Sequence, residues 1–279
     1  SRTRIFAIGN MIKDGIFTCP FCGENLTVKG KSLFCVNNHC FDVAKSGYVN
    51  LLPVDKKNSV NPGDNKEMIA ARVRVMNKGY YKTLADKIIE KLGGLNPTRI
   101  LDAGCGTGYI PYRLKEEFKG TEVVGTDISK YAIEQASKLY KEPAFAVASS
   151  KSMPFEKGKA DAVICAFAPV YASEFGRVSK EGAIFLRVVP AKEHLYGLKE
   201  FLYDAPRYNE EDETSFCGYE GIGVEKAEGE FVGDKDDIAA LVKMTPYYYH
   251  TSVEKLEKIN SIERLAVNTA FEIRTFRKI

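Results

Sequence analysis

One short stretch of this chain, residues 99–108, restricts the fold more than any other. It reads Arg-Ile-Leu-Asp-Ala-Gly-Cys-Gly-Thr-Gly, an apolar strand followed by an acid and three alternating glycines. A helix-like segment follows at residues 107–118. A strand, a glycine turn and a helix in this order let a ligand approach bare backbone at the carboxyl edge of a sheet. The stretch therefore predicts an α/β fold with a ligand at the glycines.

The spacing of the glycines separates this loop from the dinucleotide fingerprint G-x-G-x-x-G. The glycines are Gly104, Gly106 and Gly108, so the third comes one residue early and Tyr109 stands at the fingerprint's last position. A G-x-G-x-G loop preceded by Leu-Asp, here with Asp102, resembles the S-adenosylmethionine loop of class I methyltransferases. A glycine-rich turn that binds nothing is the alternative.

A second acid ends the next predicted strand, residues 121–127. Asp127 lies 23 residues after Gly104. At this place a carboxylate can accept hydrogen bonds from both hydroxyls of an adenosine ribose. The alternative is an N-cap for the helix that runs to Tyr140. Because the glycine loop lies upstream, ribose binding is favoured.

Strands and helices alternate through much of the chain. Besides the two strands already named, strands are expected at 144–148, 161–167, 183–189 and 266–276. Helices are expected at 67–76, 81–92, 128–140, 170–178, 192–203, 234–244 and 252–262. Residues 206–230 are polar and are expected to be irregular. The alternation predicts a doubly wound, mostly parallel sheet.

Four of the seven cysteines lie in the first 40 residues. Cys19 and Cys22 form a C-x2-C pair. Twelve residues separate Cys22 from Cys35, and three more separate Cys35 from the adjacent His39 and Cys40. Two such knuckles supply the tetrahedral nitrogen and sulfur ligands that zinc prefers, and a segment this short needs metal to fold. We expect a closed, structural zinc site with either His39 or Cys40 as the fourth ligand. The odd cysteine count argues against a disulfide framework.

Charge is unevenly spread along the 279 residues. Residues 1–90 carry 14 Lys and Arg against 8 Asp and Glu, whereas the whole chain has a net charge of only +3. A basic front end suits an anionic partner, although a solvated surface gives the same pattern. The residues expected to contact phosphates are Lys29, Lys31, Lys45, Lys56, Lys57, Arg72 and Arg74. No apolar run spans a bilayer and no signal sequence is visible, so we expect no membrane partner and a cytoplasmic location.

Nearly the whole chain, from about Phe17, resembles the bacterial 23S rRNA (guanine-N1)-methyltransferases. The most specific matching segment is Gly47-Tyr-Val-Asn-Leu51, beside the cysteine knuckles. The other matching motifs lie at residues 19–22, 35–42, 44–53, 62–64, 101–109, 147–150, 153–155 and 244–246.

This resemblance implies a Rossmann-like class I methyltransferase domain behind a small zinc-ribbon module. The expected boundaries are a zinc-binding RNA-recognition module at 1–50, a linker at 51–75 and the methyltransferase domain at 76–279. The implied cofactor is S-adenosylmethionine. The implied target is N1 of a guanine in a hairpin of 23S rRNA, near the peptide exit tunnel.

The resemblance also implies roles for individual residues. The zinc ligands fall on Cys19, Cys22, Cys35 and His39, which leaves Cys40 as a spare thiol. The cofactor contacts fall on Tyr81, Gly106, Thr107 and His194. The family often has Glu in place of Thr107, and a hydroxyl there is still compatible with binding.

Several questions stay open in the sequence. No catalytic base can be named, since residues 166–171 read Ala-Phe-Ala-Pro-Val-Tyr where amino-methyltransferases carry Asn/Asp-Pro-Pro-Tyr. This departure favours a ring nitrogen as the target. Residues 247–249 are three tyrosines that could stack on a base or belong to the core. The alternatives to an rRNA methyltransferase are an inactive zinc-ribbon RNA-binding protein and a small-molecule methyltransferase. The oligomeric state is not fixed, and a homodimer is compatible.

Overall fold

The computed structural model describes residues 12–53, 65–210, 215–245, 248 and 251–279. The strands are β1 (Thr27–Lys29), β2 (Ser32–Phe34), β3 (Cys40–Asp42), β4 (Val49–Asn50), β5 (Arg99–Ala103), β6 (Glu122–Asp127), β7 (Ala144–Val147), β8 (Ala160–Ala166), β9 (Ser179–Pro190), β10 (Tyr219–Gly233) and β11 (Leu265–Lys278). The helices are α1 (Lys66–Asn77), α2 (Lys82–Gly93), α3 (Tyr109–Glu117), α4 (Lys130–Leu139), α5 (Ala172–Val178), α6 (Tyr196–Leu202), α7 (Lys235–Lys243), α8 (Val253–Glu257) and the 3-10 helix Lys258–Ser261.

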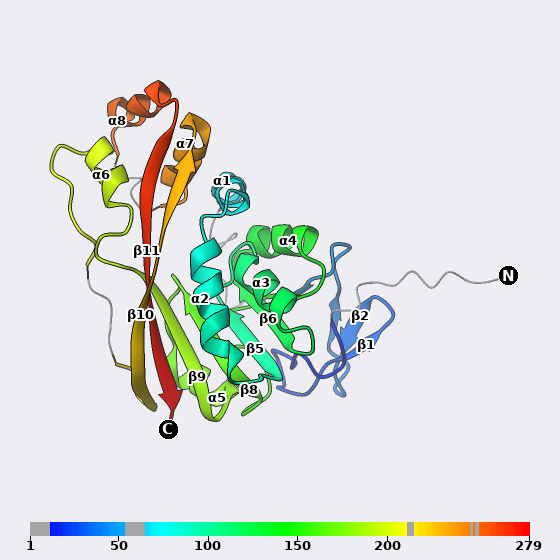
Figure 1. Cartoon of the computed structure of the whole chain (residues 1–279). Helices are drawn as coiled ribbons and strands as arrows, with labels where there is room; N and C mark the ends of the chain where they lie inside the picture. Colours follow the sequence, from blue (N-terminus) through cyan, green and yellow to red (C-terminus); the bar gives the residue numbers. More distant parts are fainter. Residues whose placement is uncertain (1–11, 54–64, 211–214, 246–247, 249–250) are drawn as a thin grey trace.

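A single large sheet forms the centre of the molecule (Figure 1). Its strand order is β10-β11-β9-β8-β5-β6-β7-β4. All pairs from β9 to β4 are parallel, and β11 runs antiparallel to both β9 and β10. The order reverses direction between β5 and β8, which are neighbours although two strands separate them in the chain. This arrangement confirms the expected doubly wound, mostly parallel sheet.

Both faces of the sheet are covered, because successive residues of a strand point to opposite sides. In β5, Ile100 belongs to one apolar core together with Leu84 and Ile88 of α2. Its neighbour Leu101 belongs to a second core, which includes Phe175 of α5. Strands that are buried on both faces read as nearly continuous apolar runs, which is why the parallel strands are readable in the sequence.

The cysteine-rich segment forms a small antiparallel sheet, β1-β2-β3, at the side of the molecule near β6 (Figure 1). It is packed on the second core rather than separate from it. The Thr18 amide donates to the Pro154 carbonyl oxygen at 2.8 Å, and the rings of Phe17 and Phe155 lie 5.7 Å apart. Residues 49–50 already form β4 of the large sheet, and residues 66–75 belong to α1. The division at residues 50 and 75 stays a prediction.

The expectation of an irregular segment at 206–230 is wrong for its second half. Residues 219–233 form β10, which pairs with β11 from Tyr219 opposite Lys278 to Gly233 opposite Leu265. The strand lies at the edge of the sheet and most of its side chains are exposed. Its glycines and glutamates therefore show no apolar alternation, and its conformation depends on the hydrogen bonds that β11 supplies.

The antiparallel pair β10–β11 extends beyond the rest of the sheet, and α6, α7 and α8 gather at its far end (Figure 1). This extension faces the loops that follow the parallel strands, and a cavity lies between the two. None of the helices in the described part of the chain is both long enough and apolar enough to cross a membrane.

Candidate active site and metal centre

The glycine loop connects β5 to α3 with all three glycines in the left-handed region. Their φ angles are +87° at Gly104, +54° at Gly106 and +80° at Gly108. A Cβ atom on Gly104 would lie 2.5 Å from the Cβ of Ala168, and one on Gly108 would lie 2.8 Å from the Cβ of Ala136. These two glycines are therefore needed for packing as well as for backbone conformation. A Cβ on Gly106 meets nothing closer than 3.5 Å, so this glycine leaves room beside the loop.

Asp127 closes the loop from the end of β6. One carboxylate oxygen accepts the Gly106 amide at 2.9 Å and the other accepts the Ser129 amide at 2.8 Å. The N-cap of α4 is Ser129, whose side chain accepts from the Ala132 amide. The carboxylate of Asp127 is thus placed at the glycine loop, and the alternative role as the N-cap residue belongs to Ser129.

Asp102 is buried at the start of the same loop and only 1% exposed. Neither of its carboxyl oxygens has a hydrogen-bond partner among the described residues. Burial, and to a lesser extent the negative charge of Asp127, raises the pKa of Asp102 to about 8. It lines a narrow space together with Gly104, Gly106 and Thr107. An unpartnered acid in this place suits a ligand that brings a cationic group.

The site residues fit S-adenosylmethionine on these observations. The glycines form a cradle of bare backbone, Asp102 lacks the cationic partner that a methionine ammonium group would provide, and Asp127 places a hydrogen-bond acceptor at the loop. The space at the loop holds only ≈ 20 Å³, and Arg72 and Tyr81 are among the residues that line it. Ligand pockets usually enclose about 300 Å³ or more, so the space has to widen when a cofactor enters.

A larger cavity of ≈ 690 Å³ opens directly beside the glycine loop. It is shared between the loop after β8 and the extension made by β10–β11 and its helices. Arg72, Tyr81 and Phe167 line both this cavity and the narrow space at the loop. The two spaces are therefore adjacent. Tyr81, at the N-cap position of α2, lies between them.

His194 lies in the larger cavity and not at the glycine loop. Its Nδ1 accepts the Ala270 amide at 3.0 Å, so the proton of the neutral ring is on Nε2, which lies 2.8 Å from the Tyr80 hydroxyl. Burial lowers the pKa of His194 to about 4, so the ring is neutral near pH 7. Both ring nitrogens are engaged by the protein itself.

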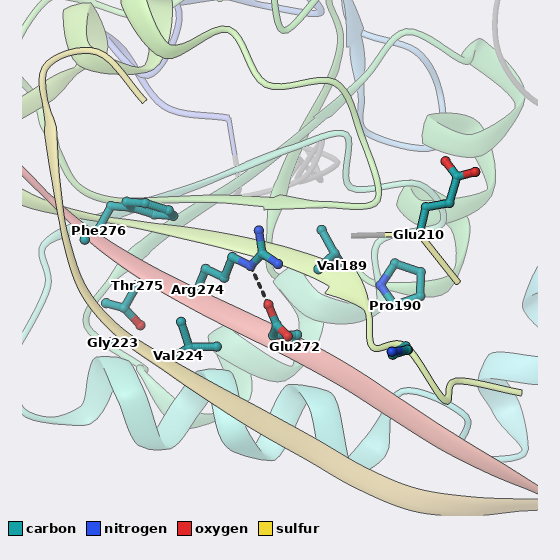
Figure 2. Close-up of a pocket in the computed structure, with 11 residues that line it drawn as sticks. Val189, Pro190, Glu210, Gly223, Val224, Glu272, Arg274, Thr275 and Phe276 are labelled. Atoms are coloured by element: carbon teal, nitrogen blue, oxygen red, sulfur yellow. Dashed lines mark hydrogen bonds and ion pairs between the residues drawn. The ribbon is translucent and has the colours of Figure 1, made fainter. Parts of the chain in front are cut away.

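A neighbouring cavity of ≈ 460 Å³ continues the first toward β10 (Figure 2). Val189, Pro190 and Glu210 line both cavities. Arg274 and Glu272 project into the second one from β11 and form an ion pair (Figure 2). The two cavities are therefore neighbours along β9 and β11.

Sequence reasoning missed several residues of the larger cavity. Phe167 and Arg187 lie on or next to strands whose apolar pattern indicated core, and Phe271 lies on the last strand. The signal that could have identified Phe167 is its position directly after β8, at the carboxyl edge where ligands bind in such sheets. Nothing in the sequence indicates Phe271, because the pairing of β11 with β9 places it there.

The expectations about the three tyrosines and the basic residues have mixed outcomes. Tyr247, Tyr249, Lys56 and Lys57 lie outside the described residues. Tyr248 is partly buried against the core, with the Lys243 ammonium of α7 over its ring. Arg74 donates through Nε to Asp237 at 2.7 Å and links α1 to α7, and its side chain is still 44% exposed, so its contact with phosphates stays a prediction. Lys29, Lys31 and Lys45 are exposed.

The metal cluster consists of Cys19, Cys22, Cys35 and His39, whose ligand atoms all lie within 4.8 Å of one another. The Sγ atoms of Cys22 and Cys35 are 3.7 Å apart, and His39 Nδ1 lies 3.4 Å from Cys19 Sγ and 3.3 Å from Cys35 Sγ. A tetrahedral zinc ion with Zn–S near 2.3 Å separates its ligand atoms by roughly 3.5–3.8 Å. The donors and their spacing therefore fit zinc. Cys40 is exposed and lies outside the cluster.

Each of the two zinc knuckles contains a residue with a left-handed backbone that allows its tight turn. Gly23, with φ +78°, lets its amide donate to the Cys19 carbonyl, and the Cys19 amide donates to Glu24 at 2.7 Å. Asn38, with φ +62°, does the same in the second knuckle, where the Cys35 amide donates to His39. Asparagine tolerates this conformation better than most residues. It turns the chain so that His39, rather than Cys40, faces the other three ligands.

Comparison with known proteins places these two parts in one family. The RlmA N-terminal zinc-ribbon family model matches residues 17–60, and a methyltransferase domain model matches residues 100–186. The 23S rRNA (guanine(748)-N(1))-methyltransferase of Streptomyces fradiae is 30% identical over 86% of this chain and 88% of its own length. YxjB of Bacillus subtilis, named as a 23S rRNA (guanine-N1)-methyltransferase, is 35% identical over 69% of this chain and 71% of its own length. The chain belongs to the 23S rRNA (guanine-N1)-methyltransferase family.

Among solved structures, phosphoethanolamine N-methyltransferase 2 from Haemonchus contortus is 15% identical, with a TM-score of 0.42 over 77% of this chain and 60% of that protein. Membership of the guanine-N1 methyltransferase family makes S-adenosylmethionine the cofactor of the glycine-loop domain and zinc the metal of the ribbon. The chain is a methyltransferase with an N-terminal zinc-ribbon segment.

Proposed function

We propose that this protein transfers a methyl group from S-adenosylmethionine to N1 of a guanine in a hairpin of 23S rRNA near the peptide exit tunnel, in the cytoplasm. The observation that carries the proposal is the contact between the two cavities. The space at the glycine loop and the ≈ 690 Å³ cavity share Arg72, Tyr81 and Phe167 as walls. A base in the larger cavity would therefore lie next to the methyl donor.

The cofactor is held, in this proposal, by residues at the carboxyl ends of β5 and β6. Asp102 pairs with the methionine ammonium group, and Asp127 accepts hydrogen bonds from the ribose. Gly104, Gly106 and Gly108 let the backbone approach, and Thr107 and Tyr81 complete the walls. His194 supports the site through its hydrogen bond to Tyr80, which precedes Tyr81 in the chain.

The cofactor supplies a methyl group on a cationic sulfonium, which leaves as a neutral thioether. Transfer to N1 would break the S–C bond as the N1–C bond forms, and the N1 proton of guanine would pass to a base or to water. The protein contributes mainly by holding N1 in line with the methyl group. This orientation can lower the activation barrier by several kcal/mol. Buried walls such as Phe271 keep water away from the reacting atoms.

The target base must leave its stack to enter this cavity. The zinc ribbon and the exposed Lys29, Lys31 and Lys45 would hold the RNA backbone meanwhile. The neighbouring cavity of ≈ 460 Å³ offers space for a nucleotide next to the target. This division of work is the reason to regard residues 1–50 as an RNA-recognition module, residues 51–75 as a linker and residues 76–279 as the methyltransferase domain.

The decisive experiment incubates the zinc-loaded protein with labelled S-adenosylmethionine and unmodified 23S rRNA fragments. Primer extension then locates the product, because a methyl group on N1 blocks base pairing and stops reverse transcription. We expect label in RNA and one stop at a guanine in a hairpin. Label on small molecules only would favour a small-molecule methyltransferase instead. Binding of RNA without binding of cofactor in calorimetry would favour an inactive RNA-binding protein. Light scattering of the same sample measures whether it is a homodimer.

A further inference from the structure

Phe167 has a conformation that packing does not explain. It follows β8 with a left-handed backbone, φ +57°, which is strained for a side chain this bulky. Its side chain is 37% exposed, so burial of the ring does not account for the strain. Strained residues of this kind concentrate at functional sites, where surrounding contacts hold them in place.

Contacts on both sides of Phe167 fix this backbone. Its amide donates to the Val188 carbonyl oxygen at 3.1 Å. In the next residue, the Ala168 carbonyl oxygen accepts from the Arg187 guanidinium at 2.6 Å. The Ala168 side chain packs so closely on the glycine loop that a Cβ on Gly104 would lie 2.5 Å from it. The position of Phe167 is therefore tied directly to the loop that holds the methyl donor.

Five rings line the larger cavity: those of Tyr80, Tyr81, Phe167, His194 and Phe271. Tyr80, His194 and Phe271 are each at most 5% exposed. Tyr81 stacks on Phe167 with ring centroids 5.5 Å apart and an interplanar angle of 23°, and Phe271 supports Phe167 at 5.6 Å. Among these rings Phe167 combines a rigid backing of other aromatics with a large exposed surface.

We infer that the exposed surface of Phe167 stacks on the target guanine and holds its N1 beside the cofactor. The inference rests on the proposed function and names the residue that positions the acceptor. Every base has a π face, so an aromatic ring can hold it without reading its edge. Because Phe167 lines both the narrow donor space and the larger cavity, a base stacked there is adjacent to the methyl group.

The first test compares Phe167→Leu with Phe167→Tyr. Leucine keeps an apolar side chain but loses the flat face, whereas tyrosine keeps it. We expect Phe167→Leu to lower kcat/KM for RNA by about 5- to 150-fold, which is the usual range for one lost base stack. Its affinity for S-adenosylhomocysteine should fall by a smaller factor than its kcat/KM for RNA, and Phe167→Tyr should keep most of the activity. Full activity of Phe167→Leu on RNA would overturn the inference.

The second test uses the absence of tryptophan from the chain. Phe167→Trp creates a single fluorescent reporter that can be excited apart from the tyrosines. With S-adenosylhomocysteine bound, an unmodified hairpin RNA should quench it, since a stacked guanine quenches indole fluorescence. Leu95→Trp is the matched control, because Leu95 is 42% exposed. It precedes the amino end of β5, whereas Phe167 follows the carboxyl end of the parallel strand β8. We expect its fluorescence to change little.

The outcomes separate this inference from the proposed function. Equal signals from both reporters, while gel shifts show that RNA binds, would contradict stacking at Phe167 and leave the methyltransferase activity standing. A parent protein that methylates no RNA would overturn both. Quenching confined to the reporter at position 167, in a protein that methylates RNA, supports both.

Discussion

At the scale of single residues, the acid of the glycine loop is a strongly perturbed group in the proposed cofactor site. The pKa of Asp102 is raised to about 8, against about 4 in an unfolded chain. The folded protein therefore binds more protons than the unfolded one between these values. The contribution of Asp102 to the free energy of unfolding therefore falls as the pH rises through this interval, by at most about 1.4 kcal/mol per pH unit.

We predict that Asp102→Asn removes this pH dependence. Urea unfolding of the cofactor-free protein at pH 5 and pH 8 should show the parent losing stability relative to the variant as the pH rises. The same variant should bind S-adenosylmethionine about 10-fold or more weakly, because a charge-assisted hydrogen bond is lost. Identical pH profiles for the two proteins would show that Asp102 ionises normally.

The contribution of His194 to stability depends on pH in the opposite direction. Its pKa is lowered to about 4 by burial, below the value near 6.5 of an unfolded chain. The unfolded state then binds more protons in this interval, so stability is lost as the pH falls from about 6.5 toward 4. We predict that His194→Phe, which leaves the Ala270 amide and the Tyr80 hydroxyl without this partner, costs about 2–4 kcal/mol at pH 7. The difference from the parent should shrink at pH 5, as measured by urea unfolding. A pH-independent difference would argue against a buried neutral histidine.

At the scale of elements, the zinc ribbon and the second core of the sheet depend on each other. Phe17 and Leu26 of the ribbon segment are buried in the same core as Phe155 and Val163. Loss of zinc should therefore expose apolar surface of the large sheet and not merely unfold a detached segment.

We predict that Cys22→Ser abolishes stoichiometric zinc binding and lowers the melting temperature of the whole protein by several degrees. Cys40→Ser is the matched control, since Cys40 is exposed and outside the cluster. It should bind one zinc ion per chain and melt like the parent. Metal analysis and calorimetry of the two variants measure both effects. A Cys22→Ser protein that keeps its zinc would rule out the assigned ligand set.

At the scale of the whole molecule, the basic residues and the cofactor site lie on different parts. Lys29, Lys31 and Lys45 are exposed on the ribbon segment, whereas the cavity lies beside the β10–β11 extension. In Figure 1 the ribbon and the helix α8 lie on opposite sides of the sheet.

We predict that replacing Lys29, Lys31 and Lys45 together by Glu weakens RNA binding about 10-fold or more and reduces its dependence on salt. Each lost phosphate contact should lower the slope of log affinity against log salt by about one. Affinity for S-adenosylmethionine should not change. Lys258→Glu, beyond α8, is the control and should bind RNA like the parent. Filter binding at several salt concentrations measures the slopes, and an unchanged slope in the triple variant would argue against an RNA contact on the ribbon.

Much of this architecture could be predicted from the sequence because its causes are local. The parallel strands read as apolar runs, and the knuckle cysteines are close in the chain. The strand β10 could not be predicted, because its glycines and glutamates become a strand only when β11 pairs with them. The fourth zinc ligand was ambiguous for a similar reason, since the left-handed Asn38 decides which of His39 and Cys40 faces the metal.

By itself the sequence determined the donor half of this protein. The spacing of Gly104, Gly106 and Gly108 depends on backbone φ angles and close approach, which are local properties that the residue type reveals. Only the tertiary structure decided the acceptor half. The cavity is assembled from residues as distant as Tyr81, Phe167 and Phe271, and their contact follows from strand order and from the antiparallel pairing of β11 with β9. Residues brought together by long-range pairing carry no common pattern in the chain, so the proposed site for the base becomes visible only in the folded molecule.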